Sequence, residues 1–203
     1  NLILAGESTA CYDGQFFFDT DHVWGESGTS SNDISIDISA LPVGGAGYAG
    51  TTTDPSPEEL AQAFLKAIQQ MYTFKSDTGK PINQNARSFL IEVPVSFMGA
   101  AANAVSNDKL ALGRANPLMA TGFNISLHVN PRLTWTDKFA VFRTDGIGNT
   151  RPFICQEMDR IRYTHLDENS DLYHNEDRME YGAKTWRGVG YGLPQHAVLA
   201  TLT

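Results

Sequence analysis

The sequence has few cysteines, few charged residues and no long apolar run. Its 203 residues include two cysteines, Cys11 and Cys155, which are too few for a disulfide framework and belong to no CxxC pair. We expect two separate buried thiols. Charged residues make up 19% of the chain and hydrophobic residues 41%, a balance that excludes a disordered chain and a coiled coil. No apolar run approaches the roughly 18 residues of a membrane span, so we expect no membrane contact.

Positive charge is also scarce. The chain has 15 Lys and Arg against 23 Asp and Glu, a net charge of −8, so it has no overall electrostatic attraction for nucleic acid. The arginines between residues 151 and 187 stand among acidic residues and have no accompanying aromatic stripe. The sequence also contains no Walker loop. We therefore expect neither specific nucleic-acid recognition nor a nucleotide cofactor, and no cofactor of any other kind.

Negative charge is concentrated near the C-terminal end. Between residues 167 and 180 six acids stand against one base, Arg178. A run of this kind is typical of a solvated loop or turn. It is also a candidate surface for contact with Lys or Arg of a partner or of another copy of the chain. The candidate residues are Asp167, Glu168, Asp171, Glu176 and Asp177.

Glycine and serine are both plentiful in the loop expected over residues 24–56, which contains six of each. Such density prevents regular structure over most of its length. The alternation of Ile34, Ile36 and Ile38 with polar residues predicts one short strand inside it. A loop of this length within one domain is typical of a functional segment or of one ordered by a partner.

The rest of the chain predicts helices first and strands later. Ser56, Pro57 and Glu59 form the start signal of a helix, a capping box with proline in the first turn. An apolar stripe at Leu60, Phe64, Ile68 and Met71 continues that helix. A second helix is expected over 94–105, and strands over 88–93, 123–129, 138–142, 152–156 and 160–163, with 179–189 and 193–202 as a final pair. Helices before strands, without strict alternation, favour an α+β fold.

Two groups of residues offer catalytic or metal-binding alternatives. Gly6 to Ala10 follows an apolar run, and with Asp171-Leu172-Tyr173-His174 it resembles the Gly-Asp-Ser-type esterases, with Ser8 as nucleophile and His174 as base. Glu7 replaces the Asp of that motif, and the oxyanion block is missing. Asp19, Asp21 and His22 could hold a divalent metal, although bonding of the Asp side chains to nearby backbone is the favoured interpretation.

A third resemblance covers more of the chain. Residues 11–22, Cys-Tyr-Asp-Gly-Gln-Phe-Phe-Phe-Asp-Thr-Asp-His, resemble the signature of the Mu-like phage major head subunit family, gpT, and are followed by a Gly/Ser-rich loop. Residues 151–157 and 180–195 resemble two further blocks of that family, although Val23 and Pro194 depart from its pattern. The matching residues are Tyr12, Asp13, Gly14, Gln15, Phe17, Asp19, Asp21, His22, Pro152, Phe153, Gln156, Gly182, Gly190, Tyr191 and Gly192.

This resemblance implies the Hong Kong 97-like fold of tailed-phage capsids. Residues 1–203 would form one region holding the axial domain and part of the peripheral domain, with the N-terminal arm and spine helix upstream of Asn1. The chain would be a structural subunit of a phage or prophage head, without catalytic residues. Its copies would form hexamers and pentamers of an icosahedral shell around double-stranded DNA.

The implied surroundings follow from that role. Partners would be copies of the chain, a scaffold, portal or decoration proteins, and packaged DNA touched without sequence specificity. The protein would be found in the virion, and in the host cytoplasm during assembly. Under this resemblance Gly14 serves a turn, Phe16 or Phe17 fills the core, and Asp19, Asp21 and His22 bond locally. A cargo-carrying compartment on the same fold remains an alternative.

Overall fold

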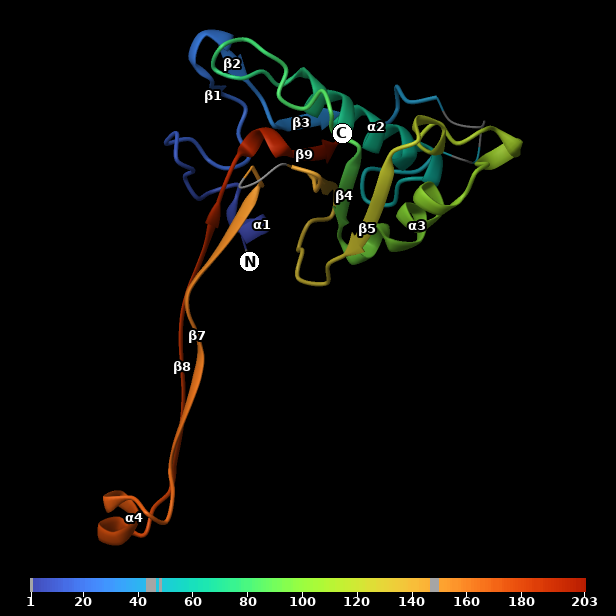
Figure 1. Ribbon diagram of the computed structural model, residues 1–203. Coiled ribbons are helices and arrows are strands. Elements are labelled where there is room, and N and C mark those ends of the chain that lie inside the picture. The colour runs from blue at the N-terminus through green and yellow to red at the C-terminus, as the bar shows by residue number, and fades with distance from the viewer. Residues whose placement is uncertain (1, 43–46, 48, 147–149) are drawn as a thin grey trace. The chain divides into compact units, whose positions relative to one another are not determined.

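The computed structural model describes residues 2–42, 47, 49–146 and 150–203 (Figure 1). The chain divides into two compact units. The first contains Asn1–Pro152 and Tyr191–Thr203, and the second contains Phe153–Gly190. Among the described residues, none of the helices is both long and apolar enough to cross a membrane.

The first unit is built on a five-stranded mixed sheet with the order β3-β9-β6-β4-β5. The outer pairs β3–β9 and β4–β5 are parallel, whereas β6 runs antiparallel to both β4 and β9. The sheet therefore joins the beginning, middle and end of the chain. Its strands are β3 (Asp33–Ile36), β4 (Ser88–Val93), β5 (Asn124–Val129), β6 (Lys138–Arg143) and β9 (Ala197–Leu202).

Two helices, α2 (Pro57–Thr73) and α3 (Met98–Ser106), pack on one face of this sheet. The capping box of α2 is confirmed, because Ser56 Oγ accepts the backbone N–H of Glu59 and Glu59 Oε2 accepts that of Ser56. The predicted apolar stripe of this helix is buried against strands β6 and β9. A short 3-10 turn at Val95–Phe97 precedes α3, so this helix begins four residues later than expected.

Shorter elements complete the first unit. They are α1 (Leu2–Ala5), the pair β1 (His22–Val23) and β2 (Thr29–Ser30), and 3-10 turns at Gly25–Ser27, Ala111–Gly113, Met119–Thr121 and Pro194–His196. The N-terminal segment lies on the face of the sheet opposite to α2 and α3, where the Phe18 ring is 6.3 Å from that of Phe142. The apolar run at residues 2–5 is thus one helical turn rather than the strand that a nucleophile turn would follow.

The second unit is a long two-stranded hairpin. Strands β7 (Phe153–Leu166) and β8 (Glu180–Tyr191) pair with each other, and α4 (Asp171–Glu176) lies between them in the chain. Most of its side chains are exposed on both faces of the ribbon. We refer to the two strands as the stem and to residues 167–180 as the acidic tip.

Two predictions for the C-terminal half were wrong. The strands expected over 152–156 and 160–163 are one strand, β7, which begins at Phe153. The charged residues between them alternate with Met158, as a solvated ribbon allows. The expected pair of 179–189 with 193–202 does not form. Instead β8 pairs with β7, and β9 enters the core sheet between β3 and β6. A 3-10 turn at Pro194–His196 separates β8 from β9 and permits this change of partner.

The Gly/Ser-rich stretch 24–56 is partly regular. The strand predicted at its isoleucines is confirmed as β3, and Ile36 and Ile38 are buried. Residues 43–46 and 48 of the expected loop lie outside the described residues. The two thiols are separate as predicted, but Cys155 is exposed on the hairpin rather than buried, and Cys11 is half-buried.

Candidate functional site

The segment 11–22, here called the signature segment, folds as a tight turn followed by an irregular stretch. Gly14 has φ +87°, a left-handed conformation that costs little only for glycine, and its N–H donates to the Cys11 carbonyl. Asp13 accepts the backbone N–H of Gln15 through Oδ1. Its second oxygen, Oδ2, lies 2.7 Å from Nδ1 of His22. The turn therefore brings the carboxylate of Asp13 onto the imidazole nine residues later.

His22 is fully buried and stacks on Trp24, with ring centroids 5.1 Å apart and planes tilted by 12°. Asp19 accepts the backbone N–H groups of Phe16 and Thr20. Burial would raise the pKa of Asp19, but these backbone bonds, with a hydrogen bond to Asp21 and the charge of His22, together lower it. Asp21 is exposed. No group of three or more His, Cys, Asp or Glu residues suited to a metal ion occurs in the described part of the chain.

Asn32 ties the signature segment to the C-terminal end of the chain. Its Nδ2 donates to the carbonyl of Phe17 at 2.8 Å and to that of Pro194 at 3.2 Å. Its Oδ1 accepts the backbone N–H of Asp19 at 2.9 Å. The residue is 2% exposed, so water does not compete for these bonds. One amide side chain thus bonds three backbone groups, two in the signature segment and one at Pro194.

Further contacts join the same regions. The buried Phe17 ring stacks on Tyr191 at 4.7 Å, and the Tyr191 hydroxyl donates to the Leu2 carbonyl. Burial raises the pKa of the Cys11 thiol, which stays protonated and donates to the Gly192 carbonyl. The backbone N–H of Gly192 donates to the Pro152 carbonyl. The structure therefore gathers residues 11–22, 151–152 and 191–194, three regions singled out in the sequence, into one cluster within the first unit.

The remaining residues singled out by the family resemblance occupy other places. Tyr12 and Phe16 are exposed, while Gln15 is half-buried. Phe153, Gln156, Gly182 and Gly190 lie on the stem of the hairpin.

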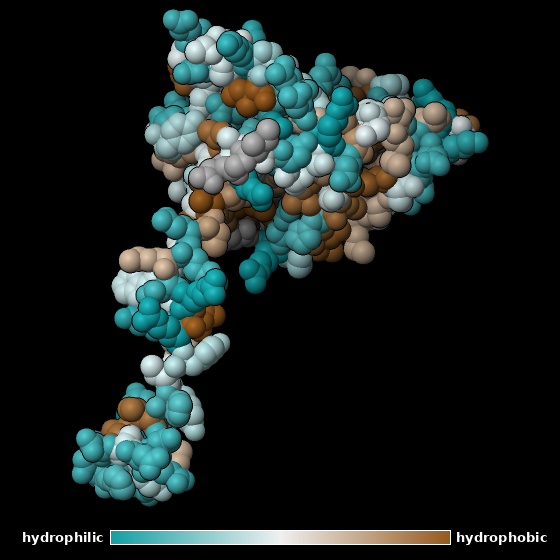
Figure 2. Space-filling view, in the orientation of Figure 1, coloured by the Kyte–Doolittle hydropathy of each residue, from teal (hydrophilic) through white to brown (hydrophobic). Residues whose placement is uncertain are grey.

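The stem of the hairpin exposes large apolar side chains. Met158, Tyr163 and Tyr181 are 82%, 78% and 76% exposed, and such side chains are usually covered in a soluble protein. Figure 2 shows hydrophobic side chains among hydrophilic ones on the visible surface of this ribbon. The exposed apolar residues of the second unit are Ile154, Met158, Ile161, Tyr163, Leu166, Met179, Tyr181, Trp186 and Val189.

The acidic tip presents its carboxylates to solvent. Ser170 caps α4 by accepting the N–H of Tyr173, and Asp177 ends this helix in a left-handed conformation. Arg178, the one base of the tip, lies 4.0 Å from Glu176 and 3.8 Å from Glu180. Glu168, Asp171, Glu176 and Asp177 are exposed and Asp167 is half-buried.

The two candidate esterase residues belong to different units. Ser8 belongs to the first unit, where its hydroxyl donates to the Ala5 carbonyl, and His174 belongs to the second. Glu7, at the position of the motif's Asp, accepts the indole N–H of Trp135 and pairs with Lys138. It therefore connects the N-terminal segment to the sheet.

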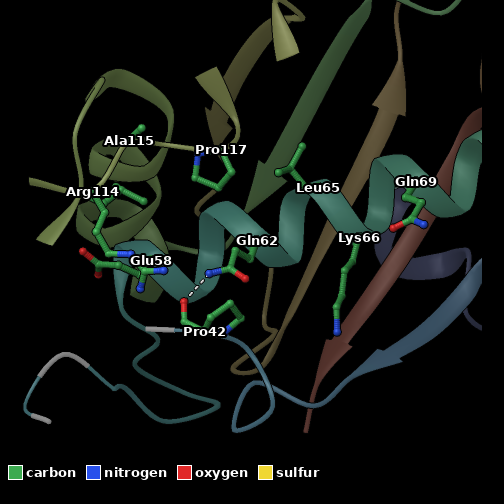
Figure 3. Close-up of a pocket in the computed structure, with 10 residues that line it drawn as sticks. Pro42, Glu58, Gln62, Leu65, Lys66, Gln69, Arg114, Ala115 and Pro117 are labelled. Atoms are coloured by element: carbon green, nitrogen blue, oxygen red, sulfur yellow. Dashed lines mark hydrogen bonds between the residues drawn. The ribbon is translucent and has the colours of Figure 1, made fainter. Parts of the chain in front are cut away.

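A cavity of about 370 Å³ lies beside α2 (Figure 3). Gln62 donates to the Pro42 carbonyl across it, and Glu58 accepts the backbone N–H of Ala111. Among the described residues the lining contains no Ser, Cys or His, so it offers no hydroxyl or thiol nucleophile and no imidazole base. The lining residues are Pro42, Glu58, Gln62, Leu65, Lys66, Gln69, Leu110, Arg114, Ala115 and Pro117.

Comparison with known proteins gives a match to one family and similarity to several solved structures, two of which follow. A capsid structure of the cyanophage P-SCSP1u matches over 86% of this chain at 15% identity and a TM-score of 0.47. A virus-like particle from Pyrococcus furiosus matches over 81% at 12% identity and a TM-score of 0.41. The chain spans 54% and 60% of the lengths of these two proteins. A search of curated proteins gave no match.

The family comparison concerns the N-terminal part, which contains the whole signature segment. The model of the family described as Mu-like prophage major head subunit gpT matches residues 1–41. Over these residues the match confirms the resemblance of this chain to the Mu-like prophage major head subunits, the major capsid proteins of phage heads.

Proposed function

We propose that this chain is a structural subunit of a bacteriophage or prophage head. In this proposal it has the Hong Kong 97-like fold, and its copies form the hexamers and pentamers of an icosahedral shell that encloses double-stranded DNA. The family match over residues 1–41 supports the role of a head subunit. The first unit would be the axial domain and the hairpin the extended loop of the peripheral domain.

The observation that carries self-assembly is the exposed hairpin. An isolated two-stranded ribbon is marginally stable in water, because neither face is covered and both edges keep unpaired backbone groups. This ribbon has strands of 14 and 12 residues and leaves Met158, Tyr181 and Trp186 more than half exposed. Neighbouring copies in a shell would cover these side chains.

The charge of the chain suits a container. A net charge of −8 keeps the shell from gripping its DNA tightly, so the packaged molecule would be touched without sequence specificity. A scaffold, portal or decoration proteins would be further partners. Assembly would occur in the host cytoplasm and the product would be the virion. No catalytic residue is needed for any of these steps.

The acidic tip is proposed as an inter-subunit surface, and charge reversal tests it. The variant Asp171→Lys/Glu176→Lys/Asp177→Lys should stay folded, since these side chains are exposed, but should assemble poorly. The matched control Glu26→Lys/Asp77→Lys/Asp108→Lys reverses three exposed acids of the first unit. Circular dichroism reports folding, and light scattering with electron microscopy reports assembly. Equal assembly of the tip variant and the unchanged chain would contradict this surface.

The enzyme alternative has its own test. If the chain were an esterase, it would hydrolyse short-chain esters and Ser8→Ala or His174→Ala would abolish the activity. Under our proposal the unchanged chain gives no turnover above buffer. A cargo compartment on the same fold would assemble in the same way, and nucleic acid inside shells isolated from infected or induced cells would distinguish a phage head from it.

A further inference from the structure

The two faces of the hairpin stem carry different charges. Side chains alternate between the faces of a strand, so Met158, Arg160, Arg162 and Thr164 share one face of β7. By the same alternation Gly182, Lys184 and Trp186 share one face of β8. Which of these faces lie on the same side of the ribbon is decided by contacts across the two strands.

Two contacts assign the faces. A Cβ placed on Gly182 would lie 2.8 Å from Thr164 Oγ1, so these residues lie on one side. Arg187 Nη2 and Glu157 Oε1 are 3.8 Å apart and share the other side. Glu157 is an odd number of residues from Thr164 on β7, and Arg187 is an odd number from Gly182 on β8. Arg160, Arg162 and Lys184 therefore lie on the same side as Met158 and Trp186. We call this side the cationic face.

The cationic face carries one acid, Glu180, at the strand end that joins the acidic tip. The other two acids of the stem, Glu157 and Asp159, belong to the other face. Arg162 reaches Asp159 at 3.1 Å, but both side chains are exposed, and exposed pairs of this kind are weak and exchangeable. Lys184 Nζ lies 5.6 Å from the centre of the Trp186 ring, so its charge is held over an apolar surface.

We infer that the cationic face of one copy binds the acidic tip of a second copy. The tip, with Glu180 included, carries six acids and one base, while the rest of the stem carries four bases and two acids. The two parts of one hairpin are therefore complementary in charge. Met158 and Trp186 supply apolar contact area beside the bases. The inference rests on the proposed function, and it adds to it the surface that receives the tip.

The backbone of the stem is open to close approach on this face. A Cβ added at Gly188 or Gly190 would meet nothing within 4 Å, and neither residue has a positive φ. Both are an even number of residues from Gly182 on β8, so they lie on the same face of the ribbon, the cationic face. A second chain could approach this part of the ribbon more closely than a surface covered by side chains allows.

Reciprocal charge reversal tests the inference. The stem variant Arg160→Glu/Arg162→Glu/Lys184→Glu and the tip variant Asp171→Lys/Glu176→Lys/Asp177→Lys should each need about tenfold or more protein to assemble. The combined variant carries both reversals, restores opposite charges between copies, and should assemble close to the unchanged level. Arg187→Glu, on the opposite face of the same strand, serves as the control and should change assembly little. Sedimentation and electron microscopy provide the readout, and circular dichroism confirms folding.

A variant without charge change gives a second measurement. Gly188→Val adds a β-branched side chain whose Cβ would have no atom within 4 Å, so the subunit should fold normally. On the cationic face this side chain would separate the two copies, and assembly should weaken.

The outcomes separate this inference from the proposed function. Normal assembly of the stem variant, or no recovery in the folded combined variant, would overturn the tip-to-stem contact and leave the head-subunit function standing. Normal shells that lose only their nucleic acid in the stem variant would mean that the face binds phosphate groups, which also overturns the inference. Unchanged chains that never associate under any condition would overturn both.

Discussion

Replacing Asn32 with alanine tests how much one side chain contributes to holding the signature segment to the C-terminal end. The amide donates to the carbonyls of Phe17 and Pro194 and accepts the N–H of Asp19. Two of these backbone groups belong to the signature segment and the third to the turn at Pro194. Removing the amide therefore takes one shared partner away from all three groups.

The size of the effect follows from the number and burial of these bonds. A buried hydrogen bond contributes about 1 kcal/mol net, so three of them contribute about 3 kcal/mol to the free energy of unfolding. Asn32 is 2% exposed, and water therefore restores little of this loss. The variant Asn32→Asp keeps the shape but places an oxygen against two carbonyl oxygens, so it should be at least as destabilised at neutral pH. A loss of this size is a large part of the usual stability of a domain.

Urea denaturation of the unassembled chain, followed by tryptophan fluorescence, measures the effect. Trp24 is buried close to the signature segment and should report its unfolding. We expect the midpoint to fall by roughly 1 M or more in Asn32→Ala. Asn85→Ala, at an exposed asparagine of the same unit, should leave it unchanged. A loss below about 1 kcal/mol in Asn32→Ala would refute the reasoning, because it would mean that the three bonds are dispensable.

Three further changes should alter the free energy of unfolding. Gly14→Ala forces a side chain into φ +87° and should cost about 1–2 kcal/mol by denaturation, whereas Gly188→Ala, without positive φ, should cost little. Ser56→Ala removes the capping box of α2 and should cost about 1 kcal/mol in the same assay; no change would mean that the cap is redundant. Burial, with the nearby charge of Arg143, lowers the pKa of His196, so stability is fully present above its ordinary pKa and is lost as pH falls through the lowered pKa. The loss between about pH 7.5 and about pH 5 should therefore be smaller in His196→Asn, and an equal loss in both proteins would contradict this linkage.

Local signals predicted much of the first unit. The capping box at Ser56, the apolar stripe that follows it, the alternating isoleucines and the strand at 88–93 each depend on neighbours within one turn or one strand, and all are present. The long-range pairing of β9 was not predictable in this way. Its partners, β3 and β6, lie far away in the sequence, and the apolar residues of β9 fit any buried strand position equally well.

The hairpin shows a second limit of sequence reasoning. Its strands lack the apolar alternation of a half-buried strand, because both faces are exposed and nothing within the unit covers them. The charged residues of the hairpin can be read from the sequence. The grouping of Arg160, Arg162 and Lys184 on one face cannot, because it depends on how β7 pairs with β8. Asn32 is a similar case, because its sequence neighbours give no sign of the carbonyl at Pro194 that it binds.

Electron microscopy of the full-length gene product tests the central claim most directly. The protein should be expressed alone and together with the genes that flank its own, and examined over a range of salt and protein concentrations. Our account predicts closed shells, or rings of five and six subunits. Monomers under every condition, including co-expression, would contradict a self-assembling head subunit.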